Sequence, residues 1–174
     1  MASAGGDGVA TLWDLRTEAK GFCLSGHRGW IHDVTFSPDD RFVASAGYDG
    51  TVKLWDTASG TERATLSGHC KAARCVVFSP DGTRLASGGS DRTIVIWDLV
   101  KGEQLQALDG YDDGIRSLAY SPDGARLAVA AGGRSVVILD AHTGGILFSS
   151  ADRDRRITAI AYSPGGELLA AGTR

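Results

Sequence analysis

Short apolar runs alternate with turn residues along the whole chain, and the alternation repeats. In the first complete unit, the run at residues 34–36 ends at Ser37-Pro38, because proline fixes its own φ and has no N–H for a strand ladder. Three more runs follow, separated by Gly and Asp residues that favour turns. The runs are rich in Leu and β-branched residues and lack helical spacing, so they predict strands. The predicted first strands are residues 34–36, 76–78, 118–120 and 160–162, and the second strands are 41–46, 84–88, 126–130 and 167–171. The third strands are 51–55, 93–97 and 135–139, and the fourth are 62–66, 103–108 and 145–149.

The unit is 42 residues long. The four prolines lie on one ladder with that step, and each of them follows a serine. Trp13, Trp55 and Trp97 keep the same step, and Leu139 takes the fourth place. Four short strands in about 40 residues is the size of one propeller blade. The pattern therefore predicts an all-β chain of four-stranded antiparallel blades, a partial or small β-propeller.

Short motifs recur within the unit in a fixed order. A Gly-His pair opens two units, at residues 26–27 and 68–69, and a Trp-Asp pair closes them, at 55–56 and 97–98, with Ser-Pro-Asp between. In this order and spacing the motifs closely resemble WD repeats, and the resemblance covers essentially the whole chain. It implies a WD-repeat propeller, whose usual role is a rigid platform for assembling other proteins.

The resemblance also implies a hydrogen-bonded tetrad in each blade. Its members are the His of Gly-His, a Ser or Thr on the second strand, the Asp of the next turn and the Trp of the third strand. These types suit a network, because an indole only donates, a carboxylate only accepts, and Ser and His can link the two. The matching residues are His27, Ser45, Asp49 and Trp55; His69, Ser87, Asp91 and Trp97; and Ser3, Asp7 and Trp13 near the N-terminus, where the His position falls on Arg153. The last full repeat has Tyr111, Val129, Gly133 and Leu139 there, so we expect apolar packing and a softer blade.

The repeat boundaries divide the chain, read as one propeller segment, into five parts. Residues 1–25 are expected to supply the third and fourth strands of a composite blade, and residues 152–174 its first and second strands. Between them lie WD repeats at 26–67 and 68–109 and a degenerate repeat at 110–151. Residues 1–6 and 169–174 align with the same second-strand positions. We expect the copy at 169–174 to pair there through a short hairpin, and the removal of residues 1–5 to be tolerated.

Closed propellers of the family usually have about seven blades, so four blades are expected to leave the ring open. Three interpretations follow: a fragment of a longer WD-repeat protein, which the mid-strand start favours; a homodimer that closes an eight-blade ring; and a strained four-blade monomer. Arg outnumbers Lys by 14 to 4, which favours a bacterial source.

Composition excludes several classes of protein. The net charge of −3 supplies no basic stripe for nucleic acid, and no run of apolar residues is long enough for a membrane span. Three cysteines are an odd number, so reduced thiols and a cytoplasmic location are expected.

Two groups of residues suggest chemistry but have a simpler interpretation. Ser, His and Asp occur together as in a hydrolase, yet the same set recurs 42 residues later and no Gly-x-Ser-x-Gly motif is present. His69, Cys70 and Cys75 do not have the spacing of a closed metal site. We therefore expect no catalytic residue, no metal and no cofactor.

The remaining candidate is a surface. In the family, partners often bind the rim formed by the loop after Gly-His, the start of the first strand and the turn before the tetrad Asp. The residues at these positions are Trp30, His32, Tyr48, Lys71, Arg74, Ser90, Asp112, Arg116 and Arg156. Trp, Tyr and Arg are enriched at binding hot spots; the alternative for Trp30 is packing under a neighbouring loop.

The sequence therefore predicts a non-catalytic scaffold that binds other proteins or peptides. The alternative is a sensor or regulatory propeller segment of a multidomain signalling protein, such as a kinase or NTPase, with catalysis elsewhere. An enzyme that uses a propeller pocket stands third.

Overall fold

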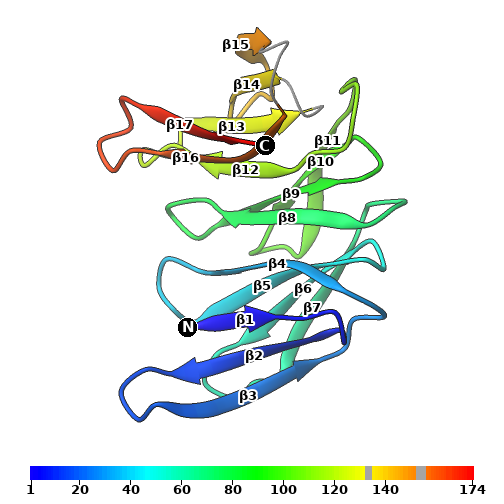
Figure 1. Ribbon diagram of the computed structural model, residues 1–174, viewed down its shortest axis with the longest axis vertical. Coiled ribbons are helices and arrows are strands. Elements are labelled where there is room, and N and C mark those ends of the chain that lie inside the picture. Colours follow the sequence, from blue (N-terminus) through cyan, green and yellow to red (C-terminus); the bar gives the residue numbers. More distant parts are fainter. Residues whose placement is uncertain (132–134, 152–155) are drawn as a thin grey trace.

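The computed structural model describes residues 1–131, 135–151 and 156–174. Within these ranges the chain forms strands and no helix, arranged as antiparallel sheets that follow one another in chain order (Figure 1). The expected all-β architecture of four-stranded blades is confirmed. The strands are β1 (Ala2–Ala4), β2 (Val9–Asp14), β3 (Ala19–Ser25), β4 (Ile31–Phe36), β5 (Phe42–Gly47), β6 (Thr51–Asp56), β7 (Glu62–Ser67), β8 (Ala73–Phe78), β9 (Arg84–Gly89), β10 (Ile94–Asp98), β11 (Glu103–Leu108), β12 (Ser117–Tyr120), β13 (Arg126–Ala131), β14 (Ser135–Asp140), β15 (Ile146–Ala151), β16 (Ile157–Tyr162) and β17 (Leu169–Thr173).

The Ser-Pro-Asp motif closes the hairpin between the first and second strands of a blade. The Ser37 hydroxyl donates to Asp39 Oδ1 over 2.6 Å and accepts from the Phe42 N–H over 2.9 Å. Ser79 and Ser121 make the same two bonds in the next two blades. The serine thus accepts a hydrogen bond from the first N–H of the second strand, across the turn that follows the first strand.

Neighbouring blades pack through their first strands. Strand β4 contacts β8, β8 contacts β12, and β12 contacts β16. Two side chains tie these strands together: Asp33 Oδ2 accepts from the Val76 N–H over 3.0 Å, and Ser117 Oγ accepts from the Ile160 N–H over 3.2 Å. Residues at one repeat position of the first strand are therefore brought close to each other.

The two chain ends differ from expectation. Strand β1 pairs with β2 in a sheet of order β1-β2-β3, and β16 pairs with β17 in a separate sheet. Both copies of the second strand are paired, so the N-terminal part supplies three strands rather than two. The physical reason is local: a short turn joins β1 to β2, so their pairing closes only a small loop.

A side-chain bond holds the N-terminal copy in place. Trp13 Nε1 donates to Ser3 Oγ over 2.9 Å, and Ala171 at the equivalent position of the other copy has no hydroxyl to accept it. Residues 1–5 thus supply β1 and the acceptor of Trp13, and their removal would take both away.

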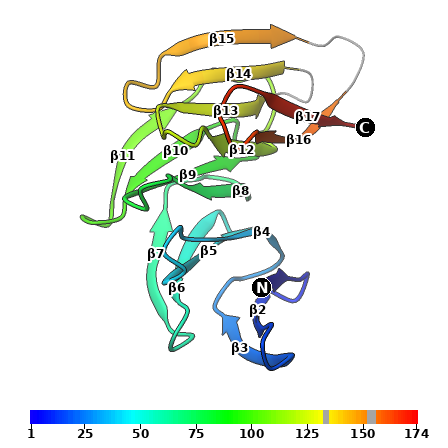
Figure 2. The same cartoon turned by 90° about the vertical axis from the view of Figure 1, so that its left-hand side faces the viewer.

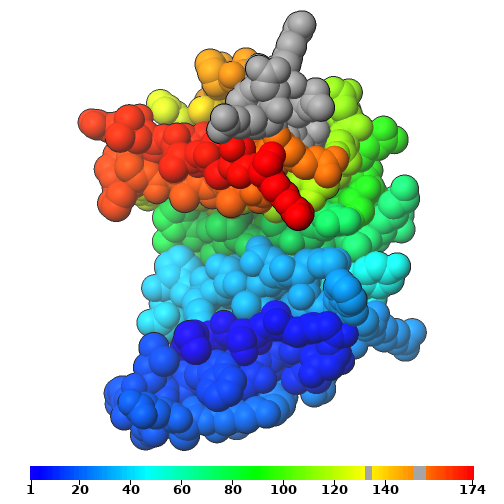
Figure 3. Space-filling model, in the orientation of Figure 1, coloured from blue at the N-terminus to red at the C-terminus, as the bar shows by residue number. Residues whose placement is uncertain are grey.

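In the part of the chain that the structure describes, the sheets follow an arc that does not close on itself (Figure 2). The space-filling view shows the N-terminal sheet, in blue, and β16–β17, in red, separated by the blades between them (Figure 3). The arc leaves β1 and β17 each at the edge of a sheet.

Candidate functional site

The four expected tetrad residues of the first full blade lie in one hydrogen-bonded chain. Trp55 Nε1 donates to Ser45 Oγ over 2.8 Å, and Ser45 Oγ lies 2.7 Å from His27 Nε2. His27 Nδ1 lies 3.1 Å from both oxygens of Asp49. Because a carboxylate only accepts, the hydrogen of this contact lies on Nδ1.

The carboxylate at the end of this chain is strongly stabilised. Asp49 also accepts from the Arg28 N–H over 2.8 Å and from the Thr51 hydroxyl over 2.7 Å. Burial by itself would raise the pKa of Asp49, but these hydrogen bonds and the one from His27 outweigh burial and lower the pKa to about 2. Asp49 is therefore ionised at neutral pH and fixes both the His27 ring and the loop that follows it.

The next blade repeats the network. Trp97 Nε1 donates to Ser87 Oγ over 3.0 Å, and Ser87 Oγ lies 2.8 Å from His69 Nε2. His69 Nδ1 lies 3.2 Å from each Asp91 oxygen. Burial opposes ionisation of Asp91, but hydrogen bonds from Thr93, His69 and the Cys70 N–H, with the favourable charge interaction of His69, lower its pKa.

The geometry of these tetrads suits a structural role and is unlike that of a nucleophilic active site. Ser45 and Ser87 have no exposed surface, and each oxygen already accepts an indole N–H. A nucleophilic serine must instead be open to its substrate and face oxyanion donors. The two networks have the same geometry in adjacent blades, and each stabilises its own blade from within.

The other sets are incomplete. Trp13 and Ser3 are bonded, and Asp7 Oδ1 accepts from the Val9 N–H over 3.1 Å. Arg153, at the His position of this set, lies outside the described residues. In the degenerate repeat, Val129 and Leu139 are buried and Tyr111 packs against the same apolar cluster, while Gly133 also lies outside the described residues.

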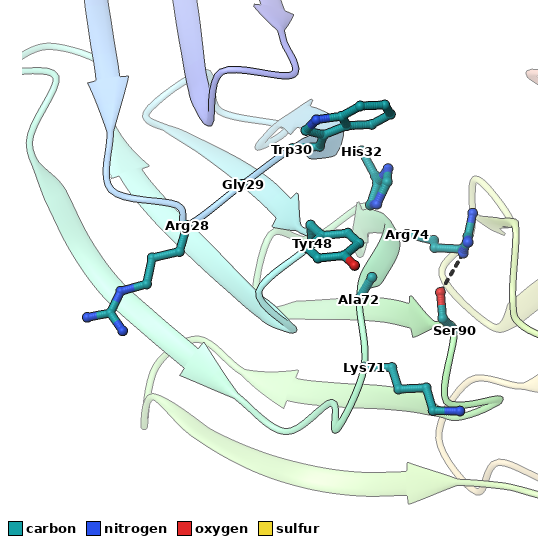
Figure 4. A pocket seen from close by; sticks show the side chains of 9 residues that line it. All are labelled: Arg28, Gly29, Trp30, His32, Tyr48, Lys71, Ala72, Arg74 and Ser90. Atoms are coloured by element: carbon teal, nitrogen blue, oxygen red, sulfur yellow. Dashed lines mark hydrogen bonds between the residues drawn. The ribbon is translucent and has the colours of Figure 1, made fainter.

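The rim carries an open groove between the first two full blades (Figure 4). Its volume is about 1040 Å³, and six of the expected rim residues line it: Trp30, His32, Tyr48, Lys71, Arg74 and Ser90. The other three lining residues, Arg28, Gly29 and Ala72, were not expected from the sequence. Arg28 directly follows the tetrad His, and that position is the signal that could have indicated it. We call this set of nine residues the rim groove.

Backbone bonds hold the two aromatic residues of the rim groove in place. The Tyr48 N–H donates to the Trp30 carbonyl over 2.8 Å. Gly29 has a φ of +111°, and an added Cβ there would lie 3.4 Å from the Tyr48 ring, so a side chain would be strained at this position. Trp30 and Tyr48 are each 64% exposed, so the alternative of Trp30 packed under a loop does not hold.

The cations of the rim groove come from separate strands and loops. In Figure 4, Arg28 extends away from the other labelled residues, whereas Arg74 reaches Ser90, its Nε donating to Ser90 Oγ over 2.5 Å. Burial and the neighbouring Arg74 lower the pKa of His32. None of the nine lining residues is acidic, so the rim groove is apolar and positive.

Three of the expected rim residues lie elsewhere. Asp112 borders a different hollow, beside Tyr111. Arg156 Nη2 lies 3.4 Å from Asp113 Oδ2. Arg116 lines a smaller cleft that adjoins the rim groove through His32 and Arg74.

The described residues contain no group of three or more His, Cys, Asp and Glu placed to hold a metal ion. Cys23 and Cys70 are exposed and Cys75 is buried, all three as free thiols. Within the same residues, no helix has the length and hydropathy that a membrane crossing requires.

Comparison with known proteins places this architecture of repeated blades in a family. The family model "WD domain, G-beta repeat" matches residues 19–56 and 60–98, and the model "Anaphase-promoting complex subunit 4 WD40 domain" matches residues 107–163. The chain belongs to the WD-repeat family, whose propellers are generally non-catalytic platforms for protein interaction.

Among known proteins, the chain is similar to Ribosome assembly protein 4 from Chaetomium thermophilum. The two are 37% identical over 43 residues, which is 25% of this chain and 8% of that protein. The match thus covers about one repeat. These comparisons do not support the homodimer, one of the three interpretations of the open ring.

Proposed function

We propose that this chain is a non-catalytic scaffold that binds a partner protein through an extended peptide segment lying in the rim groove. The observation that carries the proposal is the pair of exposed aromatic residues, Trp30 and Tyr48, at one open hollow. Exposed aromatics clustered in a groove are costly to leave in water and are typical anchors of interfaces.

The surroundings of the pair support a binding role. The tetrad of the same blade fixes the loop that holds Trp30, because Asp49 accepts the Arg28 N–H. A groove whose walls are fixed before binding loses less conformational entropy when a partner docks. Lys71 and Arg74 border the groove from the next blade, so a partner with acidic residues beside an apolar one is complementary in charge.

Selection from a displayed library of random peptides tests the proposal. The chain is immobilised, and enriched peptides are counter-selected against the double variant Trp30→Ala/Tyr48→Ala. Leu105→Ala serves as the matched control, because Leu105 is also exposed but lies on β11, the outer strand of its sheet.

The expected result is peptides that bind the wild type and the Leu105→Ala variant saturably and lose binding to the double variant. Enrichment should favour an aromatic or aliphatic residue next to Asp or Glu. Peptides that bind all three proteins equally, or no enrichment above an uncoated surface, would contradict the proposal.

A further inference from the structure

One repeat position of the first strands gathers cationic side chains at a small cleft. His32, Arg74, Arg116 and Thr158 follow one another at intervals of 42 residues. Because the first strands of neighbouring blades contact each other, these residues come together and line a cleft of about 180 Å³. We call this set of four residues the oxyanion cleft.

Two nitrogen atoms of the oxyanion cleft residues lack partners. His32 Nε2 and Arg116 Nε are buried, and neither has a hydrogen-bond partner among the described residues. A buried polar atom without a partner costs about 1–3 kcal/mol, and such an atom in a native structure calls for an explanation. A bound acceptor supplies one.

The charge of the oxyanion cleft points to the same kind of ligand. Arg74 and Arg116 border it, and none of its four lining residues is acidic. The whole chain carries a net charge of −3, so the positive charge here is local. Two guanidinium groups at one cleft repel each other until an anion lies between them.

The arrangement of donors favours a tetrahedral anion over a planar one. His32 and Arg74 lie on β4 and β8, and Arg116 directly precedes β12, so donors approach from three neighbouring blades. A carboxylate offers two oxygens in one plane, whereas a phosphoryl group offers three that point in different directions. Arg74 uses Nε for Ser90, which leaves its terminal nitrogens for a ligand. The Thr158 hydroxyl donates to the Gly172 carbonyl over 3.3 Å, so Thr158 acts as a wall.

We propose that the oxyanion cleft binds a phosphoryl group, held by Arg74, Arg116 and His32. The group can belong to free phosphate or to a phosphorylated side chain, and both present the same oxygens. The proposal goes beyond the scaffold function, and its test does not require a partner peptide.

Calorimetric titration at constant ionic strength measures the affinity for three probes: inorganic phosphate, acetate and a blocked tripeptide containing phosphoserine. The test variant is Arg116→Gln, which lies outside the rim groove. The matched control is Arg63→Gln, which removes the same charge from an exposed position on β7. Circular dichroism confirms that each variant keeps its strands.

Saturable phosphate binding is expected, at least 10-fold weaker for Arg116→Gln and unchanged for Arg63→Gln, with acetate weaker than phosphate. Tighter binding of the phosphoserine peptide than of phosphate would assign the group to a modified partner, and the reverse order to the free ion. Absence of saturation, equal affinity for acetate, or an equal loss with Arg63→Gln would overturn the proposal.

Titration of phosphate and of a selected library peptide separates this proposal from the scaffold function. Trp30→Ala should weaken binding of the library peptide and leave phosphate binding unchanged, because Trp30 does not line the oxyanion cleft. Arg116→Gln should weaken phosphate binding and leave binding of library peptides unchanged. Either proposal can therefore fail alone.

Discussion

Replacing Ser45 by Ala removes the centre of the first tetrad. The hydroxyl accepts from Trp55 Nε1 and bonds His27 Nε2, and Trp55 and His27 are only 2% and 9% exposed, so water cannot replace it. Each buried group left unpaired costs about 1–3 kcal/mol. Because His27 keeps its bond to Asp49, we expect Ser45→Ala to lower the free energy of unfolding by about 2–4 kcal/mol.

A double-mutant cycle shows whether the network is coupled. Trp55→Phe alone should also cost about 2–4 kcal/mol, since it removes the indole donor. Both changes break the same bond, so the double variant should cost about 1–2 kcal/mol less than their sum. Urea denaturation followed by far-ultraviolet circular dichroism gives the free energies without relying on tryptophan emission.

The control pair is Trp55→Phe with Leu139→Ala, which lies in the degenerate repeat and has no tetrad network. Leu139 is 1% exposed, so its truncation should cost about 2–5 kcal/mol as a simple cavity. The two effects should add within about 0.5 kcal/mol. Additivity of Ser45→Ala and Trp55→Phe to the same precision would refute the coupled network.

Three further predictions follow from single groups. The pKa of Asp49 is lowered from 3.8 to about 2, so ionised Asp49 stabilises the folded state by about 2 kcal/mol above pH 4, and this stabilisation is lost as the pH falls towards 2. Asp49→Asn should therefore make the free energy of unfolding less dependent on pH in that window. Asp40 has a φ of +59° where the sister repeats have glycine, so Asp40→Gly should raise the unfolding free energy by about 0.5–1 kcal/mol in urea denaturation, and a loss would contradict the strain. Burial raises the pKa of the Cys75 thiol, so a thiol reagent should modify Cys23 and Cys70 in the native protein and reach Cys75 only on unfolding.

The sequence could predict the blades because each strand boundary carries a local signal. Proline after the first strand and a turn after the second recur every 42 residues, and the strands occur between them. The left-handed turns were harder to locate, because Glu18, Asp40 and Arg92 adopt positive φ where other repeats have glycine. In those repeats the fold determines the turn in spite of the residue.

The ends of the chain and the oxyanion cleft could not be predicted in the same way. Two copies of the second strand compete in the alignment. The short turn between β1 and β2 and the bond from Trp13 to Ser3 show why β1 pairs with β2. His32, Arg74 and Arg116 were expected on the rim, yet their convergence depends on how neighbouring first strands pack. Their common repeat position was the available signal.

The central claim is that the rim groove binds a partner and that Trp30 is its anchor. The direct measurement is the dissociation constant of one selected peptide for the wild type and for Trp30→Ala, with the unfolding free energy of both proteins measured alongside. Because Trp30 is 64% exposed, binding should weaken about 30-fold, which corresponds to about 2 kcal/mol, while the unfolding free energy changes by less than about 0.5 kcal/mol. A large loss of stability with unchanged affinity would make Trp30 a structural residue and contradict the claim.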